Sequence, residues 1–342
     1  MNTAFYVGTY ATSEREGILC FDADFLAGKI HKRWTYKGIV NPSYLLKSHK
    51  NKDILYSVEE LAPEGRIRVL RITDSGLVQL CTLSSGGAHP CHLALDDHEE
   101  FLFVSNYTSG NLAVFRLNEQ GVPVCRTDLV HHIGKGPNVF RQDCAHVHYA
   151  CYHDDILYVN DLGVDKVFRY FLNRETGKLE QSYPPIKIPS GSGPRHLCFS
   201  KTTPNIFYLI CELTSTVYVV RVSNRDTKIL QSIRTLPSDF SGLSTAAAIK
   251  LSNDGKALFV SNRGHDSITV FSILKDGTLL LKQVCKTGGK APRDVSFIGD
   301  YIVAANQESN CITVLFYDAK EIQLKQTGVF FEVECPVLVL ST

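Results

Sequence analysis

A short hydrophobic stretch that ends in a polar pair recurs seven times in this chain, with copies about 50 residues apart. The copies occupy residues 5–10, 55–60, 102–107, 157–162, 208–213, 258–263 and 302–307. A repeat of this length is typical of a β-propeller, in which each blade is a four-stranded antiparallel sheet. We therefore predict an all-β, seven-bladed β-propeller that forms a single domain over residues 1–342.

Each repeat is predicted to hold four strands, and the recurring stretch is the second of them. The first strands are predicted to start at Pro42, Pro90, Val147, Pro194, Ala246 and Pro292. Six such starts accompany seven second strands, and the missing first strand is predicted at residues 336–340 (PVLVL). The C-terminal strand is therefore expected to join the N-terminal strands in one shared blade, which would remove the open edges of a linear array. No segment has a helical period, so almost no helix is expected.

The composition excludes several classes of partner. Thirty-six basic and thirty-five acidic residues give a formal charge of +1 without a basic block, so nucleic acid is not an expected partner. The longest apolar runs have the length of a strand, which predicts no membrane partner. The N-terminus lacks the pattern of a signal peptide, and the eleven cysteines are scattered as expected for free thiols in a reducing compartment. These features predict a cytoplasmic protein.

Polar residues gather where first strands begin and second strands end. In an antiparallel blade these two points lie at the same face, so the repeats should bring both sets of residues to one mouth of the propeller channel. The first strands contribute Ser43, Cys91, His148, Arg195, Ala247 and Arg293. The second strands contribute Tyr10, Glu59 or Glu60, Tyr107, Leu162, Glu212, Arg263 and Gln307.

This predicted set of residues suits an anionic substrate. Arginines supply permanently charged, bidentate donors for a carboxylate or phosphate, and a glutamate and a histidine can each move protons. We predict as catalytic residues Glu212, His148, Arg195 and Arg263. We predict as substrate-binding residues Arg293, His146, Tyr107 and Gln307.

A purely structural role for the same residues stays open at this stage. Propeller channels are often lined with polar groups, an arginine and a glutamate from adjacent blades can form a structural ion pair, and Asp294 could neutralise Arg293. Four further histidines near strand ends are expected to be structural, namely His89, His92, His196 and His265.

Neither a metal nor a cofactor is predicted. His146 and His148 form an H-x-H pair, but two imidazoles do not complete a metal site, and no nearby carboxylate or thiolate has convincing ligand spacing in the sequence. The chain also lacks a P-loop, a dinucleotide fingerprint and a G-x-S-x-G nucleophile motif.

Four stretches link the sequence to a known family. They are GPRHLCF (193–199), CELTSTVYVV (211–220), LSNDGKALFVSNRGHDSITVFSI (251–273) and APRDVSF followed by YIVAANQESNCITV (291–314). Through them, and over essentially its full length, the chain resembles the seven-bladed propeller lactonase family. That family includes a bacterial type of 6-phosphogluconolactonase and the fungal carboxy-muconate lactonizing enzyme.

The resemblance implies an activity and a site. Arg195, Glu212, Arg263 and His148 match the polar residues that this family places in its proposed active site, while the additional His146 leaves open which imidazole acts. The implied substrate is a lactone that bears an anionic group, with 6-phospho-D-glucono-1,5-lactone of the pentose phosphate pathway as the expected one. The hypothesis is metal-independent hydrolysis, with Glu212 or His148 as general base and an arginine that stabilises the oxyanion.

Two other functions stay open on the sequence alone. A lactonizing cycloisomerase needs the same anion-binding groups and a proton donor. A binding scaffold is the other alternative, although scaffolds of the WD type have Trp-Asp and Gly-His signatures in each blade, and this chain has a single tryptophan, Trp34. The oligomeric state is not determined by the sequence.

Overall fold

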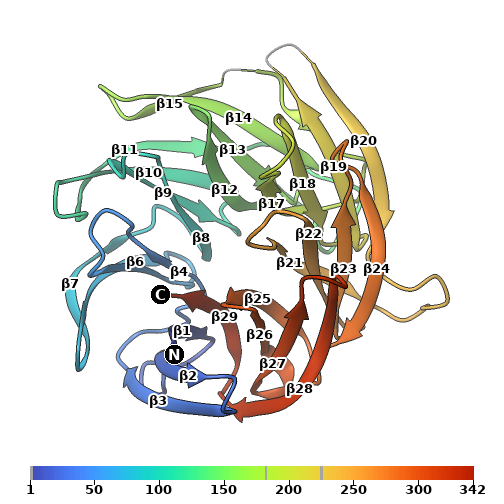
Figure 1. Cartoon of the computed structure of the whole chain (residues 1–342). Coiled ribbons are helices and arrows are strands. Elements are labelled where there is room, and N and C mark those ends of the chain that lie inside the picture. The colour runs from blue at the N-terminus through green and yellow to red at the C-terminus, as the bar shows by residue number, and fades with distance from the viewer. Residues whose placement is uncertain (1–2, 182, 224–225) are drawn as a thin grey trace. The chain divides into compact units, whose positions relative to one another are not determined.

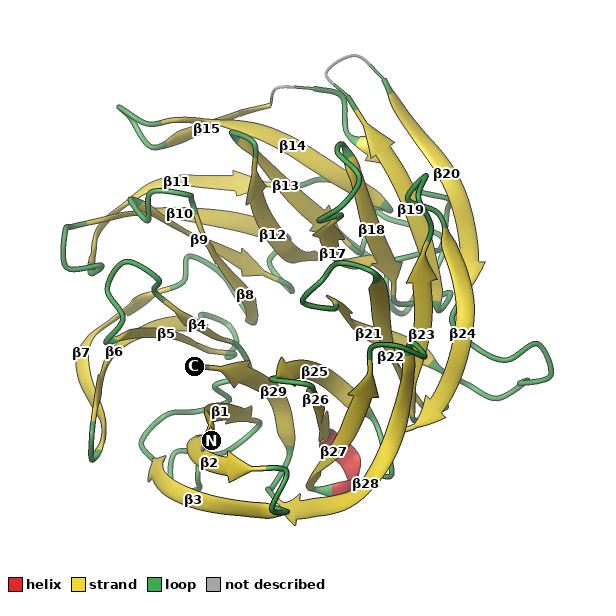
Figure 2. Ribbon diagram, viewed as in Figure 1, coloured by secondary structure: helices red, strands yellow, loops and turns green. Residues whose placement is uncertain are grey.

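The computed structural model describes residues 3–181, 183–223 and 226–342. In this part of the chain, antiparallel sheets form a seven-bladed β-propeller, as predicted (Figure 1). Among the described residues the one helical element is a 3₁₀ turn at Gln307–Ser309, drawn in red in Figure 2. By internal contacts the chain divides into two compact units. Unit 1 comprises Met1–Thr9, Leu19–Arg33 and Arg195–Thr342, and unit 2 comprises Tyr10–Ile18 and Trp34–Pro194. A single domain over residues 1–342 stays a prediction.

Unit 2 contains three consecutive blades whose strands follow one another in sequence order. The first blade consists of β4 (Leu45–Lys47), β5 (Ile54–Glu59), β6 (Arg66–Thr73) and β7 (Gly76–Ser84). The second consists of β8 (Pro90–Leu95), β9 (Phe101–Asn106), β10 (Asn111–Leu117) and β11 (Pro123–His131). The third consists of β12 (Val147–His153), β13 (Ile156–Asp161), β14 (Lys166–Asn173) and β15 (Lys178–Gln181), with the short β16 (Ile186–Lys187) also paired to β14.

Unit 1 contains the remaining blades. The first consists of β17 (Pro194–Phe199), β18 (Ile206–Cys211), β19 (Thr216–Val222) and β20 (Thr227–Arg234). The second consists of β21 (Thr245–Leu251), β22 (Ala257–Arg263), β23 (Ser267–Ile273) and β24 (Leu279–Lys286). The third consists of β25 (Pro292–Ile298), β26 (Tyr301–Asn306), β27 (Cys311–Asp318) and β28 (Gln323–Glu332). The last blade has the order β29 (Pro336–Ser341), β1 (Thr3–Thr9), β2 (Ile18–Asp24) and β3 (Lys29–Tyr36).

The two ends of the chain share this last blade, which confirms the sequence prediction. Figure 1 shows the red C-terminal strand β29 beside the blue β1, and the antiparallel register pairs Val339 with Val7. The hydrogen bonds along this pair replace two edges that would otherwise be exposed. The blade therefore cannot form until both ends of the chain are present.

The predicted start of one first strand is wrong by three residues. The strand β4 begins at Leu45 and not at Pro42. Pro42 has no N–H to donate to a sheet, and the N–H of Ser43 bonds the carbonyl of Asn41 at 2.7 Å instead of a neighbouring strand. The segment at residues 41–43 is therefore a turn. A smaller difference occurs at β21, which begins at Thr245, one residue before the predicted start.

The strands differ in burial according to their place in the blade. The second strands β5, β9, β13 and β18 are buried at every position, whereas the fourth strand β20 alternates between half-buried and exposed residues. Strands that are covered on both faces need continuous hydrophobic runs. The recurring hydrophobic stretch in the sequence follows from this burial, and it marks the second strand of each blade.

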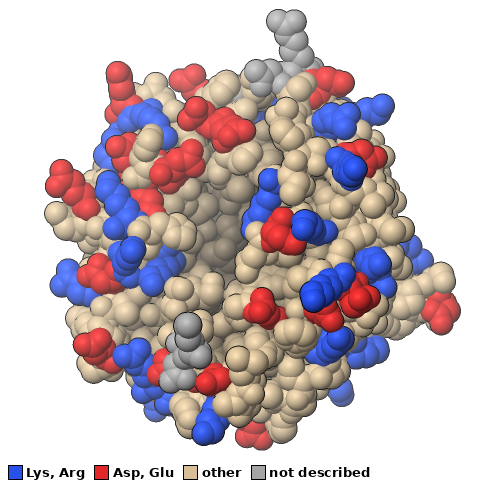
Figure 3. Space-filling view, in the orientation of Figure 1, with Lys and Arg blue, Asp and Glu red and all other residues tan. Residues whose placement is uncertain are grey.

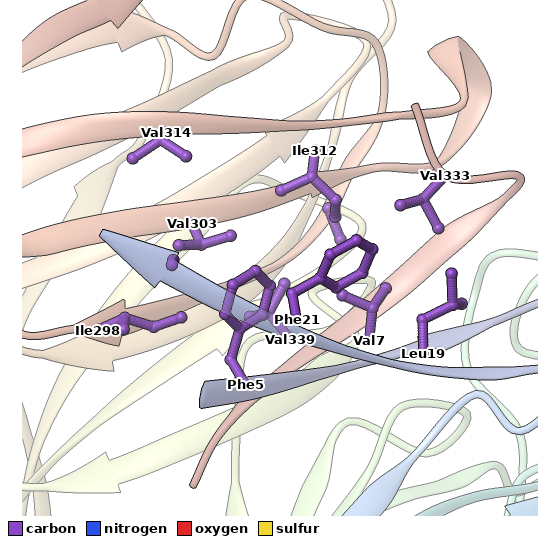
Figure 4. Close-up of a cluster of buried hydrophobic side chains, with 12 residues drawn as sticks. Phe5, Val7, Leu19, Phe21, Ile298, Val303, Ile312, Val314, Val333 and Val339 are labelled. Atoms are coloured by element: carbon purple, nitrogen blue, oxygen red, sulfur yellow. The ribbon is translucent and has the colours of Figure 1, made fainter. Parts of the chain in front are cut away.

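Neighbouring blades of unit 1 are joined by hydrophobic packing. Figure 4 shows one such cluster, in which Phe5 and Phe21 of the shared blade meet Val303 and Ile312 of the blade formed by β25–β28. The Phe5 and Phe21 rings stack with their centroids 5.4 Å apart. Truncating a buried phenylalanine of this kind to alanine typically costs about 3–5 kcal/mol of stability, so this packing holds the strand ends in place.

The surface agrees with the balanced charge of the sequence. On the face shown in Figure 3, basic and acidic side chains are interspersed, and neither sign forms a continuous block. None of the helices in the described part of the chain has the length and hydropathy needed to cross a membrane.

Candidate active site

Three of the predicted catalytic residues come from strand ends in unit 1. Arg195 is the second residue of β17, Glu212 directly follows β18, and Arg263 is the last residue of β22. The carbonyl of Glu212 accepts a hydrogen bond from the N–H of Ala246 in the next blade, at 3.1 Å. This bond fixes the exit of β18 against the start of β21, so the three side chains are held on neighbouring backbones.

These three side chains form a buried ion-pair cluster. Glu212 Oε2 accepts a hydrogen bond from Arg195 Nε at 3.0 Å and lies 3.1 Å from Arg263 Nη2. The Glu212 and Arg195 side chains are 3 % and 4 % exposed. Each guanidinium also donates to a strand carbonyl, Arg195 to Ala247 at 2.7 Å and Arg263 to Ala246 at 3.1 Å. Both arginines are therefore fixed in orientation as well as paired in charge.

The charges within this cluster favour an anion. Two guanidiniums and one carboxylate leave a formal excess of one positive charge among Arg195, Glu212 and Arg263. Guanidinium groups keep their charge when buried and bind planar or tetrahedral oxyanions through several N–H donors. The ion pair that the sequence left open as a structural feature is present, and the excess charge gives it a capacity to hold an anion. The catalytic role of these residues stays a prediction.

A pocket of about 350 Å³ lies beside Arg263 in unit 1. It is lined by Ser244, Thr245, Arg263, Arg293, Gln307 and Glu308, among others. Arg293 is the second residue of β25, and Gln307 opens the 3₁₀ turn that follows β26. The structure thus brings together three of the predicted site residues of this unit around one hollow.

Asp294, considered as a neutralising partner of Arg293, has other contacts. Its Oδ2 accepts a hydrogen bond from the N–H of Val339 at 3.1 Å, and its Oδ1 lies 3.6 Å from Lys250 Nζ. Asp294 therefore fastens the C-terminal strand β29 to β25. This structural role accounts for a buried carboxylate next to the predicted site.

The predicted residues of unit 2 form a second, aromatic cluster. The Tyr107 ring stacks on the His146 ring at 4.4 Å between centroids, and the His148 ring meets Tyr107 edge-on at 5.7 Å. Arg141 Nη2 donates to the Tyr107 hydroxyl at 3.3 Å. The structure therefore places the rings of Tyr107, His146 and His148 together. Their convergence with the residues of unit 1 stays a prediction.

Several of the predicted positions on first strands coincide with β-bulges, a feature that the sequence did not reveal. The register between first and second strand shifts at Cys91 in β8, at His148 in β12, at Ala247 and Ala248 in β21 and at Arg293 in β25. A bulge leaves one residue without a partner in the ladder and re-aims its side chain. The bulges explain how side chains at the start of buried first strands can point in a direction that regular pairing would not allow.

The two glutamates of the second repeat, Glu59 and Glu60, have different hydrogen-bond partners. The Glu59 carboxylate accepts hydrogen bonds from Arg68 Nε at 2.9 Å and from the N–H of Val40 at 3.1 Å, so it holds its own blade together. Glu60 accepts hydrogen bonds from the hydroxyls of Tyr10, at 2.9 Å, and Ser43. Among the two alternatives, Glu60 is the one that contacts other positions of the predicted set.

The sequence search missed two neighbours of His146. Asp143 Oδ1 lies 3.0 Å and Cys144 Sγ lies 3.8 Å from His146 Nε2. Burial, followed by the charges of Asp143 and Asp161, raises the pKa of the Cys144 thiol above its usual value. The H-x-H spacing pointed to His148 as the neighbour of His146. In the structure, the loop before β12 instead brings Asp143 and Cys144 next to His146 Nε2.

Three of the four remaining strand-end histidines contact residues outside the predicted site, whereas His196 contacts the predicted catalytic residue Arg195. His92 lies between the rings of Tyr44 and Tyr149, at 4.3 and 4.1 Å. His89 Nδ1 lies 2.7 Å from the Thr108 hydroxyl, and a ring nitrogen of His196 lies 3.3 Å from Arg195 Nη1.

His265 Nδ1 contacts the Ser267 hydroxyl at 2.7 Å. Burial, followed by the charge of Lys286, lowers the pKa of His265. Both influences disfavour the charged form of its imidazole.

Comparisons with known proteins give a consistent result. The family model described as lactonase, 7-bladed beta-propeller, matches residues 4–341. A 6-phosphogluconolactonase of Bacillus subtilis is 34% identical over 326 residues, which cover 92% of this chain and 91% of that protein. A crystal structure of a putative 6-phosphogluconolactonase from Bacteroides fragilis superimposes with a TM-score of 0.91 at 26% identity, covering 100% of this chain and 98% of that one. The periplasmic gluconolactonase of Pseudomonas aeruginosa gives 0.93 at 28% identity, with 100% and 99% covered.

Proposed function

Because this chain belongs to the seven-bladed β-propeller lactonase family and hydrolyses lactones, we propose that its substrate is 6-phospho-D-glucono-1,5-lactone, which it opens to 6-phosphogluconate. This reaction belongs to the pentose phosphate pathway, and a cytoplasmic location goes with it as part of the proposal. The observation that supports it most directly is the buried cluster in which two arginines share one carboxylate.

The phosphate of the substrate is assigned to the pocket beside the cluster. Arg263 and Arg293 line it from different blades and supply two positive charges, against one carboxylate of the lining, Glu308. Arg263 is shared with Glu212 of the ion-pair cluster, and Ser244, Thr245 and Gln307 add neutral hydrogen-bonding groups. A dianion gains more from two guanidiniums than an uncharged hydroxymethyl group does. The volume of about 350 Å³ lies in the range of about 300–1,000 Å³ that is usual for small-molecule sites.

The ion-pair cluster is assigned to the reacting carbonyl. A water molecule attacks the lactone carbonyl carbon, and Glu212 accepts the proton that the water loses. The oxyanion of the tetrahedral intermediate is stabilised by a guanidinium N–H, after which the bond from the carbonyl carbon to the ring oxygen breaks and the ring oxygen takes up a proton. Donors of this kind contribute about 10²- to 10³-fold to the rate, and general acid–base catalysis about 10²- to 10⁴-fold.

Two contacts of Glu212 make it suitable for positioning as well as proton transfer. Its Oε2 holds Arg195 and Arg263 at once, so a change in its charge would be felt by both guanidiniums. His148 of unit 2 is the other candidate for the general base, and the two assignments predict different effects of substitution.

The test is the hydrolysis of freshly generated 6-phosphogluconolactone, with the rate of spontaneous opening subtracted. Glucono-1,5-lactone, which lacks the phosphate, and a muconolactone serve as comparison substrates. We expect kcat/KM to be at least about tenfold higher for the phosphorylated lactone, as one charge-assisted contact provides. Equal values with and without the phosphate would contradict the phosphate assignment.

A chelator provides a separate check on the mechanism. Because no proposed step passes through a metal ion, treatment with EDTA should leave the rate unchanged. Loss of activity that returns when a divalent metal is added would refute the proposed metal-independent mechanism.

A further inference from the structure

Asp143, Cys144 and His146 of unit 2 form a compact group of three different ligand types. Their ligand atoms all lie within 4.8 Å of one another. His146 is buried at the entrance to β12, whereas Asp143 is exposed and Cys144 is half-buried at the end of the preceding loop. We refer to these three residues as the 143–146 cluster.

The His146 ring is oriented by its surroundings. Its Nδ1 lies 3.1 Å from the carbonyl oxygen of Tyr107, which can only accept a hydrogen bond, so Nδ1 donates the hydrogen. The other nitrogen, Nε2, is then directed at Asp143 Oδ1 and Cys144 Sγ. A histidine that donates from one nitrogen to a backbone carbonyl, and presents the other to further ligands, has the arrangement found in metal sites.

The backbone and the ring of His146 are also held in place. The N–H of His146 donates to Asp161 Oδ1 at 2.8 Å, and the Tyr107 ring stacks on the imidazole with an interplanar angle of 8°. The position of Nε2 is therefore fixed independently of Asp143 and Cys144. A preformed donor of this kind lowers the ordering cost of binding an ion.

The two distances from His146 Nε2 are close to those around a tetrahedral zinc ion, and the Asp143 and Cys144 ligand atoms lie within 4.8 Å of each other. With bonds of about 2.3 Å to sulfur and about 2.0 Å to nitrogen, tetrahedral angles place those two ligand atoms about 3.5 Å apart. The observed separation of Cys144 Sγ and His146 Nε2 is 3.8 Å. Asp143 Oδ1 and His146 Nε2, at 3.0 Å, need to separate by only about 0.3 Å to reach the tetrahedral value.

We propose that the 143–146 cluster binds one divalent transition-metal ion, with Zn²⁺ as the best match to a mixed nitrogen, oxygen and sulfur donor set. On binding, the metal replaces the thiol proton of Cys144, which passes to solvent, and a bond forms to the sulfur. The thiolate and the Asp143 carboxylate then balance the two charges of the ion. Three protein ligands leave a fourth position for water.

The proposal goes beyond the lactonase reaction, because Asp143 and Cys144 have no role in it, although His146 was predicted from the sequence to bind substrate. The consequence is structural: a bound ion would tie the loop before β12 to the start of that strand. It would also add a bond to the imidazole that stacks on Tyr107.

The test is metal binding by the full chain, measured by competition with a chromophoric zinc chelator. We expect one equivalent of Zn²⁺ to bind. Cys144→Ser should weaken this binding at least about tenfold, as loss of a thiolate ligand requires, and Asp143→Asn should weaken it to a smaller extent. Cys125→Ser is the matched control, because Cys125 is an exposed cysteine on β11 outside the cluster, and it should bind Zn²⁺ like the unaltered protein.

Cobalt provides a second readout that does not depend on affinity. The Co²⁺-loaded protein should show a thiolate-to-cobalt charge-transfer absorption that is absent in Cys144→Ser and present in Cys125→Ser. Zinc binding that is unaffected by Cys144→Ser, or several weak equivalents without the charge-transfer absorption, would overturn the proposal. Because these measurements record binding and not turnover, their failure is distinct from a failure of the proposed lactone substrate.

Discussion

The two units place different chemistry at equivalent points of the same repeat. In unit 1 the entry of β17 and the exit of β18 carry Arg195 and Glu212, which form a buried ion pair. In unit 2 the entry of β12 and the exit of β9 carry His148 and Tyr107, which meet as rings. Arg195 and Glu212 belong to one blade, whereas His148 and Tyr107 come from two consecutive blades. The same kinds of strand end therefore supply an ion-pair cluster in one unit and an imidazole cluster in the other.

The two clusters also differ in how they are held. Arg195 and Arg263 are fixed by strand carbonyls in addition to Glu212. His146 is fixed by one carbonyl and by stacking, and its Asp143 partner is exposed. We therefore expect substitutions in unit 1 to have larger effects on lactone hydrolysis than the corresponding substitutions in unit 2.

The largest effect is expected for Glu212→Gln. Because it removes the proposed base and the charge that both guanidiniums share, kcat for the phosphorylated lactone should fall at least about 100-fold. The matched control is Glu60→Gln, which changes a carboxylate at the same strand exit in unit 2, where it bonds the hydroxyls of Tyr10 and Ser43. Thermal unfolding of both variants separates catalysis from folding. Equal losses of kcat in the two variants would remove the contrast between the units.

The second largest effect, weaker binding of the phosphorylated lactone, is expected for Arg293→Gln. Removing one charge from the pocket should raise KM for the phosphorylated lactone about 10- to 100-fold, as expected for a lost charge-assisted contact. The value of kcat, and the rates with glucono-1,5-lactone, should change little. Lys290→Gln is the control, because Lys290 is exposed and close in sequence. If KM rises equally for both lactones, Arg293 does not bind the phosphate.

His148→Asn is expected to have a smaller effect, a reduction of kcat of about tenfold or less, within the lower part of what acid–base groups contribute. This variant is the most direct test of whether the general base lies in unit 1 or in unit 2. If His148→Asn abolishes turnover while Glu212→Gln leaves it intact, the general base lies in unit 2 and the roles assigned here are reversed. The measurement is kcat at saturating substrate for both variants on the same day's lactone preparation.

The smallest effect concerns stability and a histidine without a proposed role in the reaction. The pKa of His265 is lowered in the folded protein, so the unfolded chain takes up its proton first as the pH falls. The stability that follows from this difference is present above the ordinary histidine pKa of about 6.5 and is lost as the pH falls below it.

Replacing His265 should therefore flatten the pH dependence of unfolding. In His265→Asn the free energy of unfolding, measured with urea between about pH 7.5 and 5.5, should decline less than in the unaltered protein, by under about 1 kcal/mol. His31→Asn is the control, because His31 is exposed on β3. A steeper decline in His265→Asn would show that the sign of this effect is wrong.

The fold could be predicted because its strongest signal is local. Strands buried on both faces require continuous hydrophobic runs, and the seven copies fall on β1, β5, β9, β13, β18, β22 and β26. The shared blade followed from a count of first and second strands. The start of β4 was misplaced because a proline before a hydrophobic segment resembles the other first strands, whereas the turn at residues 41–43 depends on a backbone hydrogen bond.

The places of the candidate residues at strand ends could be predicted, whereas the contacts between their side chains could not. Glu212 and Arg263 stand at strand ends, which the repeat locates directly. That both arginines bond one carboxylate oxygen depends on rotamers and on the packing of adjacent blades, which leave no pattern in the sequence. Asp143 lies in a loop whose path is irregular, so its approach to His146 has no periodic signal.

The pairing of β29 with β1 has a consequence for how the protein is made. The strand β1 is synthesised long before its partner β29, because the whole of the other blades lies between them in the chain. A chain that terminates before residue 336 would display an unsatisfied strand edge next to a hydrophobic surface that includes Phe5 and Val7. The shared blade therefore cannot close before β29 has been made, and until then the edge of β1 is available for pairing with other strands.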